Sequence, residues 1–500
     1  MCFPWIGRQL CGESTSFANE EGRQGVIAGL KPYPKYRDSG LPWLGQAPAH
    51  WATARNGNLF GQRNQTGFAE LPILEVSLKT GVRIRAFGSA GRKQVMSDLS
   101  KYKRAAHGDL AYNTMRMWQG ALGVCPVDGL VSPAYVVATP YPNVDPRYFA
   151  TLFRTGNYMA EIDSASRGIV KDHNRLYWEQ FKQMRSPCPP PAEQAAIVRF
   201  LDWANGRLER AIRAKREVIV LLNEQKQVII HRAVTFGVDP AVKFKPSGVP
   251  WLGDIPRHWI TLRLKHSISP IEQGWSPQCD AQSANSDEWG VLKVGCVNKD
   301  TFQGAQNKKL PAALRPDISL EIVDGDILVS RANTRELLGL AALVERPRKK
   351  LILCDKLFRF RARADHFVPK YLVLLLRSRP SRAQIESSTS GASSSMQNIG
   401  QGVLKNLWMS IPPMAEQIDI VCRIEADTKL LTWGVSRLER EIDLLREYRT
   451  RLVADVVTGK LDVREAAARL PDLPAAPEAE LTSEPFDDSG IPDEIEAEDA

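Results

Sequence analysis

The stretch that decides the fold is SGLPWLGQAPAHW at residues 39–51, because the chain repeats it as SGVPWLGDIPRHW at residues 247–259. Nine of the thirteen positions are identical in the two copies. A phrase bracketed by tryptophans is either a local packing device used twice or the start of two copies of one unit. The rest of the chain distinguishes these alternatives, since an internal repeat determines the architecture.

A longer repeat follows the phrase. Sliding the sequence so that Asp145 lies on Val368 aligns DPRYFATLFRT with VPKYLVLLLRS. The same shift aligns PCPPPAEQAAIV with SIPPMAEQIDIV and needs no gap as far as residue 239. We therefore predict two tandem units, roughly 31–240 and 241–470.

The two copies share a frame but not an interior. GDLAYN, from Gly108, matches GDILVS, from Gly325, at a slightly different offset. Between Ala52 and Leu110 we find no convincing alignment with the second copy. Short β-like stretches with Gly, Asn and Asp turns occupy this interior, such as ILEVSLKTGVRIRAF, and VLKVGCVNKDTF occurs in the second copy. Such strands beside helices predict an α+β domain in each unit.

Each unit ends in a segment that predicts a long helix. Apolar residues recur there at three- and four-residue spacing with charged residues between them, as in a coiled-coil seam with solvated flanks. The seam positions are Ile197, Leu201, Leu208, Leu222 and Ile229 in the first helix, where Val218 also fits, and Ile420, Ile424, Leu431, Leu438, Leu445 and Leu452 in the second. About 40 residues at 1.5 Å per residue would make each helix about 60 Å long. We expect the two to pair antiparallel as a spacer. Helices folded individually onto their own domains fit less well, because their polar faces are wide.

The expected fold class is therefore α+β, with two tandem α+β domains separated by two long antiparallel coiled-coil helices and a pseudo-twofold relation between the copies. The expected segments are an N-terminal extension at 1–30, a first domain at 31–190, a central helical spacer at 191–240, a second domain at 241–411, a C-terminal helical spacer at 412–470 and an acidic disordered tail at 471–500.

The charge of the chain favours a polyanionic partner. The whole chain carries +9, but residues 471–500 hold eleven Asp and Glu and no Lys or Arg. The remainder has 66 basic and 57 − 11 = 46 acidic residues, a net charge of +20. Such a body favours nucleic acid, although a generally basic surface is the alternative. No stretch is long and apolar enough for a membrane span or a signal peptide, so we expect a cytoplasmic protein.

The sequence lacks the motifs of several enzyme classes. We find no P-loop, no Gly-rich cofactor loop after a convincing strand, and no nuclease motif of the PD…[DE]xK type. SPAY at Ser132 has an alanine where an amino-methyltransferase loop needs its second proline. The eight cysteines include no CxxC pair, so no metal site is expected. His50 and His258 recur beside Trp51 and Trp259, and we interpret them as supports of a turn rather than catalytic groups. The pattern indicates a binding protein.

Several motifs together resemble the specificity subunit of type I restriction–modification systems. They are DSGLPWLGQAPAHW, GDLAYNTMRMWQGALGVCPVDGLVSPAY, GDILVSRANTRELLG with LCDKLFRF, SSSMQNIGQGVLKNLWMSIPPMAEQ, and the helix ends AVTFGVD and VVTGKLD. The resemblance covers about residues 31–470, with the motifs in the family's order and in two copies.

This resemblance implies a non-catalytic subunit with two target-recognition domains. Each domain would read one half of a bipartite, asymmetric double-stranded DNA site. The paired helices would set the separation of the halves and dock two methylation subunits. S-adenosylmethionine, ATP and Mg are implied for the methylation and restriction subunits, and no cofactor for this chain. The alternative is a basic coiled-coil scaffold for protein partners that reads no sequence; a stand-alone enzyme is remote.

Candidate DNA-binding residues are Arg, Lys, Asn, Gln and Ser side chains in the divergent interiors, because these side chains read base edges and hold phosphates. In the first unit they are Arg83, Arg85, Arg92, Lys93, Asn113, Arg116 and Gln119. In the second unit they are Ser330, Arg331, Asn333, Arg335, Ser393, Ser394, Ser395 and Gln397.

Overall fold

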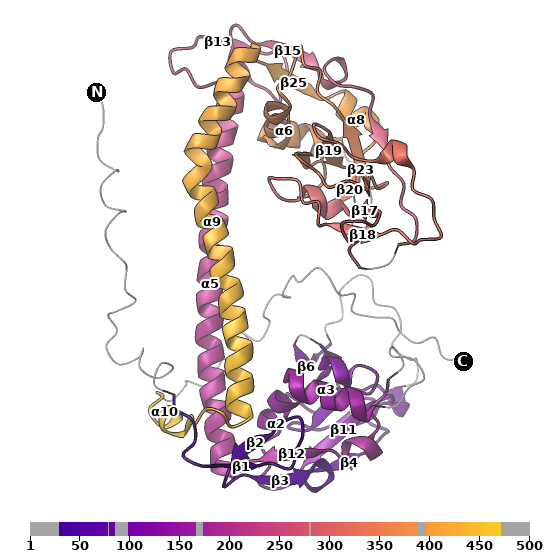
Figure 1. Ribbon diagram of the computed structural model, residues 1–500, viewed down its shortest axis with the longest axis vertical. Coiled ribbons are helices and arrows are strands. Elements are labelled where there is room, and N and C mark those ends of the chain that lie inside the picture. Colours follow the sequence, from indigo (N-terminus) through magenta and orange to yellow (C-terminus); the bar gives the residue numbers. More distant parts are fainter. Residues whose placement is uncertain are drawn as a thin grey trace. The chain divides into compact units, whose positions relative to one another are not determined.

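The computed structural model describes residues 30–78, 80–85, 99–166, 174–279, 282–388 and 397–471. The chain divides into two compact units (Figure 1). Unit 1 comprises Met1–Arg213 and Ile442–Ala500, and unit 2 comprises Ala214–Glu441. Each unit contains one module of short strands and helices together with parts of two long helices. The mixed helix-and-strand class expected from the sequence is confirmed.

The module of unit 1 contains twelve short strands among the described residues. They are β1 (Tyr36–Asp38), β2 (Gln46–Pro48), β3 (Ala52–Arg55), β4 (Phe60–Arg63), β5 (Leu74–Ser77), β6 (Gly81–Ile84), β7 (Lys103–Ala105), β8 (Leu110–Asn113), β9 (Leu122–Val124), β10 (Gly129–Val131), β11 (Tyr135–Pro140) and β12 (Arg185–Cys188). The helices are α2 (Pro146–Phe153), α3 (Gly156–Ala165), α4 (Trp178–Phe181) and α10 (Arg464–Ala468), with single 3-10 turns η1 (Asn56–Asn58), η2 (Leu99–Lys101) and η3 (Met117–Gln119).

The module of unit 2 repeats this order with differences in its interior. Its strands are β13 (Phe244–Pro246), β14 (Asp254–Pro256), β15 (Ile260–Arg263), β16 (Glu272–Gln273), β17 (Gly290–Leu292), β18 (Asn307–Lys309), β19 (Ile327–Ser330), β20 (Ala332–Asn333), β21 (Ala341–Leu343), β22 (Leu351–Ile352), β23 (Leu357–Phe360), β24 (Gln397–Asn398) and β25 (Trp408–Ile411). Its helices are α6 (Pro369–Arg377), α7 (Arg379–Ser387) and α8 (Gln401–Lys405), with 3-10 turns η5 (Leu264–His266), η6 (Val294–Val297) and η7 (Ile318–Leu320).

Both modules are built on the same four-stranded sheet. Its strand order is β4-β11-β8-β9 in unit 1 and β16-β23-β19-β21 in unit 2. The shared GD dipeptide precedes β8 and β19, and Gly108 and Gly325 take φ values of 83° and 84°, a region that favours glycine. The matched motifs therefore mark equivalent strands. The prolines at the starts of α2 and α6 occupy the first helical turn, as the sequence predicts.

The repeated phrase folds as a hairpin in each unit. In unit 1 it joins β1 to β2, and Ser39 donates its backbone N–H to the Gly45 carbonyl at 2.9 Å. In unit 2 it joins β13 to β14 with the equivalent bond from Ser247 to Gly253 at 3.0 Å. All four glycines of the two phrases have positive φ. The phrase is a rigid turn at the start of each module.

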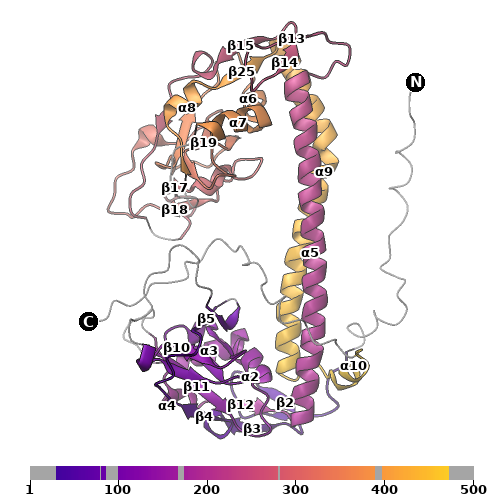
Figure 2. The same ribbon diagram turned by 180° about the vertical axis from the view of Figure 1, so that it is seen from behind.

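The two long helices are α5 (Pro191–Phe236) and α9 (Met414–Val457). In each unit their segments lie side by side and run antiparallel (Figures 1 and 2). In unit 2, Lys215 of α5 pairs with Glu441 of α9 at 2.6 Å. No helix among the described residues is long and apolar enough to cross a membrane.

The end of each long helix completes the core of the other repeat's module. Val456 and Val457, at the end of α9, belong to the core of unit 1, and Tyr148 of α2 donates to the Val457 carbonyl at 3.0 Å. In unit 2, Tyr371 of α6 donates to the carbonyl of Val234, near the end of α5, at 3.4 Å. Both tyrosines are fully buried. The core of each module therefore includes residues from both repeats of the sequence.

The structure corrects two details of the sequence analysis. Gly237 and Gly459 both follow a long helix with positive φ, at 77° and 76°, so they are equivalent. Their separation is one position shorter than that between Asp145 and Val368, so the ungapped match to residue 239 is wrong after the helix end. Val218, interpreted as part of the seam, is 44% exposed, and its neighbour Ile219 is the more buried residue.

Candidate nucleic-acid interface

A buried carboxylate fixes the strand that leads to the candidate residues of each module. Asp109, just before β8, is 2% exposed and accepts a hydrogen bond from Arg63 Nε at 2.6 Å. Asp326, just before β19, is equally buried and accepts one from Arg361 Nε at 2.8 Å. A buried charge needs such a partner. The GD motif thus has a structural role that positions the far ends of β8 and β19.

In unit 1, three candidates lie around the end of β8. The Asn113 side chain accepts from the Met115 backbone N–H at 3.0 Å and so shapes the turn. Arg116 precedes η3 and Gln119 is its last residue, and Arg116 Nη1 donates to Gln119 Oε1 at 3.3 Å. Gln119 is exposed. The structure therefore brings a cation and an amide together at one end of the sheet, while Asn113 is engaged within the chain.

The other candidates of unit 1 lie on the β5–β6 hairpin or outside the described residues. Arg83 of β6 is paired with Glu75 of β5 across the hairpin. The backbone N–H of Arg85 bonds to the Ile73 carbonyl at 2.9 Å, and its side chain is partly exposed. Arg92 and Lys93 fall outside the described residues.

In unit 2, one candidate is removed by its burial. Ser330 is 0% exposed, and its hydroxyl donates to the Leu337 carbonyl at 2.6 Å and accepts from the Leu340 backbone N–H at 3.1 Å. Its side chain therefore cannot reach DNA, and the sequence-based assignment of Ser330 is corrected. Ser393, Ser394 and Ser395 lie outside the described residues.

The remaining candidates of unit 2 are gathered by two short strands. Strand β20 pairs antiparallel with β24, which places Asn333 directly opposite Gln397. Arg331, at the base of β20, donates to the Asp355 carbonyl at 3.2 Å, and its own carbonyl accepts from the Ile399 backbone N–H. Arg335 follows β20, with its side chain 67% exposed. Two sequence stretches predicted separately thus form one surface.

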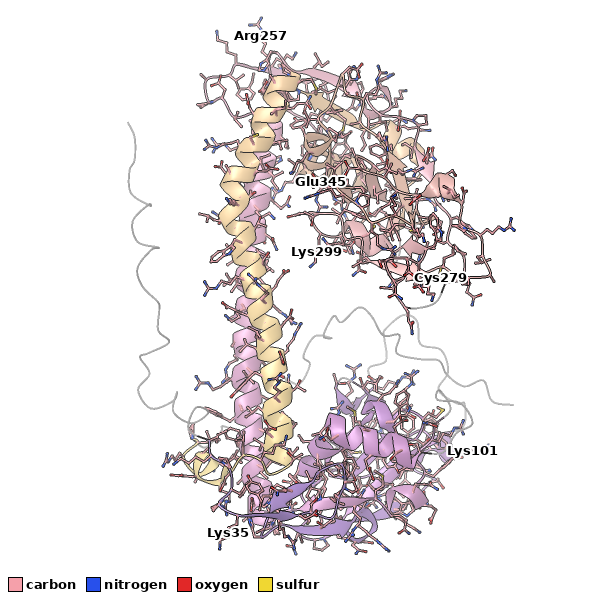
Figure 3. The ribbon with its side chains drawn as sticks, viewed as in Figure 1. Lys35, Lys101, Arg257, Cys279, Lys299 and Glu345 are labelled. Carbon is pink, nitrogen blue, oxygen red and sulfur yellow. The ribbon has the colours of Figure 1, made fainter. Side chains whose placement is uncertain are left out.

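Sequence reasoning missed an ion cluster that attaches the interior of unit 2 to α5. Lys226 of α5 and Arg377 of α6 both pair with Asp300, Arg377 Nη2 at 3.2 Å. Burial would raise the pKa of the Asp300 carboxyl, but the hydrogen bond from Lys226 and the two positive charges outweigh it and hold the pKa below its usual value. The neighbouring Lys299 lies at the surface of unit 2 (Figure 3).

Among the described residues of unit 1, no carboxylate pairs with the arginine at the equivalent place. The counterpart of Arg377 in the repeat is Arg154, which donates to the carbonyls of Gly120 at 3.1 Å and Leu78 at 2.5 Å. Burial first, and then the charge of Arg449, lowers the pKa of the Arg154 guanidinium. The repeat aligns the two arginines in the sequence, but only the structure shows that their partners differ.

The predicted seam positions are buried or half-buried, apart from Val218. Six of them are buried, namely Ile197, Leu201, Leu208, Ile420, Ile424 and Leu452, and the other five are half-buried. Large apolar side chains nevertheless remain on the outer faces. Leu221 of α5 and Leu444 of α9 are each 63% exposed, and the shift that puts Asp145 on Val368 also puts Leu221 on Leu444. The repeat thus places one exposed leucine at the same position in both copies.

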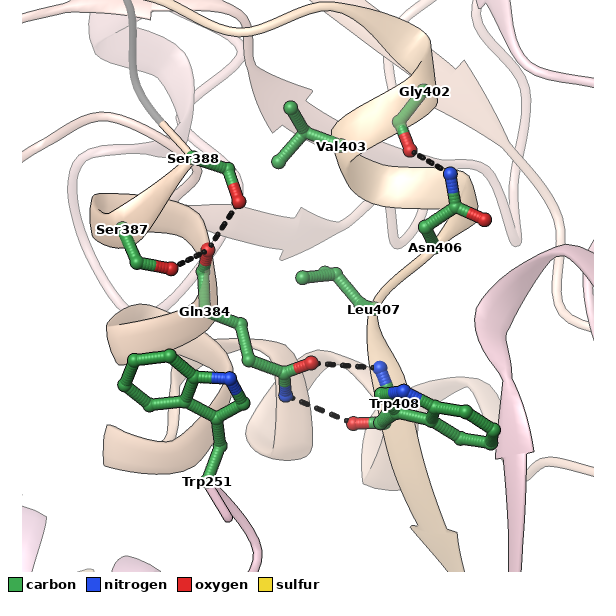
Figure 4. A pocket seen from close by; sticks show the side chains of 9 residues that line it. All are labelled: Trp251, Gln384, Ser387, Ser388, Gly402, Val403, Asn406, Leu407 and Trp408. Carbon is green, nitrogen blue, oxygen red and sulfur yellow. Dashed lines mark hydrogen bonds between the residues drawn. The ribbon is translucent and has the colours of Figure 1, made fainter. Parts of the chain in front are cut away.

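Unit 2 has a pocket of about 410 Å³ beside Trp251, at a place where the two copies differ (Figure 4). In unit 1, the ring of Tyr158 packs against Trp43 with centroids 5.0 Å apart. In unit 2, Ser381 occupies the position equivalent to Tyr158, and Trp251, the counterpart of Trp43, is 47% exposed beside the pocket. Gln384 closes the pocket floor by bonding the backbone of Trp408.

The chain is similar to known specificity subunits of type I restriction enzymes. No protein-family model matches the chain. It is 36% identical over 187 residues to the type I restriction enzyme EcoEI specificity subunit of Escherichia coli, a match that covers 37% of this chain and 32% of the relative. It is 23% identical over 355 residues to the StySPI specificity subunit of Salmonella potsdam, covering 67% and 73%. The chain thus spans about a third of the length of the first relative.

A solved structure has a similar fold. It is described as "Structural basis underlying complex assembly and conformational transition of the type I R-M system" and matches with a TM-score of 0.53 at 16% identity, over 83% of this chain and 99% of that chain. This likeness concerns the fold alone. Together with the two relatives, it confirms the resemblance to type I restriction–modification specificity subunits.

Proposed function

We propose that this chain is the DNA sequence-specificity subunit of a type I restriction–modification complex. The module of unit 1 reads one half of a bipartite double-stranded DNA site, and the module of unit 2 reads the other half. The observation that carries the proposal is one frame used twice around unrelated interiors. Glu193, Asp109 and Tyr148 recur as Glu416, Asp326 and Tyr371, whereas the candidate contact residues do not recur. Two readers of this kind suit an asymmetric target.

The long helices act in this proposal as the ruler between the half-sites. Helix α5 has 46 residues and α9 has 44. At 1.5 Å per residue each is about 65–70 Å long, and one base pair of DNA rises about 3.4 Å, so the pair sets a spacing of DNA that neither module reads. Both helices set this spacing, because the end of each one is packed into the core of a module.

The exposed faces of these helices are the docking sites for two methylation subunits. Leu221 and Leu444 are large, exposed and related by the repeat, so identical partners can dock at equivalent places. The partners supply adenine methyl transfer from S-adenosylmethionine, and restriction subunits supply ATP- and Mg-dependent cleavage. This chain contributes the reading and no catalytic residue.

Footprinting of the chain reconstituted with a methylation subunit tests the proposal. We expect two base-specific protected clusters separated by a fixed number of base pairs whose identity does not matter. Uniform, sequence-independent protection would contradict it and would favour a basic scaffold that docks other proteins.

A further inference from the structure

The β20–β24 ribbon of unit 2 carries two amide residues at directly opposed positions. Asn333 and Gln397 are a directly opposed pair, and β20 and β24 pair only with each other among the described strands. Both residues are partly exposed. The ribbon begins directly after the buried strand β19, whose end is fixed by Ser330. A rigid sheet thus presents a narrow ribbon with polar side chains.

One atom of the Gln397 amide is unsatisfied within the part of the chain that the structure describes. Its Oε1 atom is enclosed and has no hydrogen-bond partner among the described residues, although the residue as a whole is half-exposed. An enclosed acceptor without a donor costs about 1–3 kcal/mol. That cost favours rotation of the side chain outward when a donor becomes available outside the chain.

The opposite amide is only weakly held. Asn333 Nδ2 donates to Asn298 Oδ1 at 3.4 Å, close to the longest distance at which a hydrogen bond contributes. Asn333 Oδ1 accepts from the Thr334 backbone N–H at 2.9 Å, which orients the side chain. An external acceptor can therefore replace Asn298 without disturbing the turn.

We propose that the β20–β24 ribbon enters the DNA major groove and that Gln397 reads an adenine in the half-site of unit 2, with Asn333 as the adjoining contact. This inference rests on the proposed function and names the reading residues of that site. The major groove admits a two-stranded ribbon. A glutamine amide matches adenine in two places, because Oε1 accepts from the N6 amine and Nε2 donates to N7.

The charges around the ribbon suit the flanking phosphates. The Arg335 side chain is 67% exposed, and its Nη2 atom lies 3.8 Å from a carboxylate oxygen of Glu386. Lys356 is exposed, and its backbone carbonyl accepts from the backbone N–H of Arg331 at the base of β20. Cations beside a ribbon fix its register on DNA, while the amides supply the base discrimination.

The first test changes the DNA and leaves the protein unaltered. In the methylation complex, each adenine of the second half-site is replaced in turn by 7-deazaadenine, which lacks the N7 acceptor. We expect binding to weaken about tenfold at one position, the effect of losing one of two bonds to a base. This loss of affinity should be absent in Gln397→Met, because the methionine side chain has a similar length but no amide. Equal penalties in wild type and Gln397→Met would overturn the inference.

The second test changes the amide to a carboxylate. A carboxylate only accepts, and it favours the cytosine N4 amine over adenine. We expect Gln397→Glu to replace adenine by cytosine at one position of the second half-site in maps of methylated adenines, with the first half-site unchanged. Gln401→Glu is the matched control, because the amide of Gln401 already bonds Lys405 at 3.1 Å.

The outcomes separate this inference from the function on which it rests. If the wild-type complex writes a bipartite site but Gln397→Glu leaves the second half-site unchanged, the ribbon is not the reader. If Gln401→Glu also replaced adenine by cytosine in the second half-site, the inference would be overturned too, because any added negative charge would then have this effect. If wild type writes no bipartite site, the proposed function itself fails.

Discussion

Trp51 donates its indole N–H to Glu193 at 2.9 Å, and this bond fastens the end of the repeated phrase to the first turn of α5. The tryptophan is 1% exposed and the carboxylate 4%. Tyr33 donates to the same carboxylate, and His50 Nε2 lies 2.7 Å from it. Trp259 and His258 make the same contacts to Glu416, the counterpart of Glu193 in the second copy. The repeated phrase and the AEQ stretch at the start of each long helix (residues 192–194 and 415–417) therefore bind one another, and we call this contact the joint.

Removing Glu193 should destabilise unit 1 more than removing Glu416 destabilises unit 2. Glu193→Ala leaves the buried donors Tyr33 and Trp51 without an acceptor, so we expect a loss of about 3 kcal/mol. Glu416 is 21% exposed, and among the described residues only Trp259 and His258 bond its side chain, so Glu416→Ala should cost about 1–2 kcal/mol. Hydrogen exchange measured on peptides of each unit separates the two effects.

Glu209→Ala serves as the control, because Glu209 lies on the same helix and its pair with Arg449 is half-exposed. Such a pair contributes about 0–1 kcal/mol. A loss in Glu209→Ala equal to that in Glu193→Ala would contradict the role of the joint.

The ion pairs of Asp300 with Lys226 and Arg377 should make the packing of the unit 2 module on α5 depend on pH. The folded-state pKa of Asp300 is lowered, so its contribution is present above the unfolded value of about 4 and is lost as the pH falls through the lower folded value. We expect Asp300→Asn to destabilise unit 2 by about 1 kcal/mol at pH 7. The difference from wild type should shrink below about pH 4 in urea titrations. A difference that stays constant into acid would contradict the ion cluster.

Changes in one module should alter one half-site. Gln119 and Arg116 lie at the exposed end of the unit 1 sheet. We therefore expect Gln119→Ala and Arg116→Ala each to relax the base preference in the first half-site and to leave the second half-site unchanged. Maps of methylated adenines measure both at once. The paired Arg83 is the comparison residue, since Glu75 already neutralises it across the hairpin. If Gln119→Ala alters both half-sites, the assignment of one module to each half is wrong.

The repeated frame was predictable from the sequence because it depends on local patterns. The phrase, the GD strand and the helix-starting prolines each need particular residues at fixed spacing, and all three recur. The candidate site was predicted only in part. Ser330 has the chemistry of a DNA contact but is buried, because β19 is a central strand of its sheet.

Other features depend on residues far apart in the sequence. Lys226, Asp300 and Arg377 meet only in the folded unit, and the pairing of Asn333 with Gln397 depends on a contact between two distant strands. No single-sequence pattern marks these pairs. The contribution of each helix end to the core of the other repeat's module was likewise not predicted. An antiparallel helix pair alone does not specify which module each end completes.

The docking proposal predicts two equivalent sites for the methylation subunit. We expect Leu221→Glu and Leu444→Glu each to reduce the bound copies from two to one, and the double variant to bind none, as measured by native mass spectrometry. Leu430→Glu is the control, because Leu430 is 78% exposed and its repeat counterpart is Arg207. Loss of both copies from a single variant would contradict two independent sites.

The length of the helices should set the unread spacing. Inserting seven residues into both α5 and α9 preserves the helix faces and adds about 10 Å, or about three base pairs. We expect a spacer longer by two to four base pairs with both half-sites retained. An unchanged spacer would contradict the role of the helices as a ruler.

The most direct test is a genome-wide map of methylated adenines in cells that carry this chain with its methylation subunit, compared with cells that lack the chain. The account predicts one motif of two short, unrelated half-sites separated by a fixed number of unread base pairs, lost when the chain is deleted. A continuous motif, or a methylation pattern that does not depend on the chain, would contradict it.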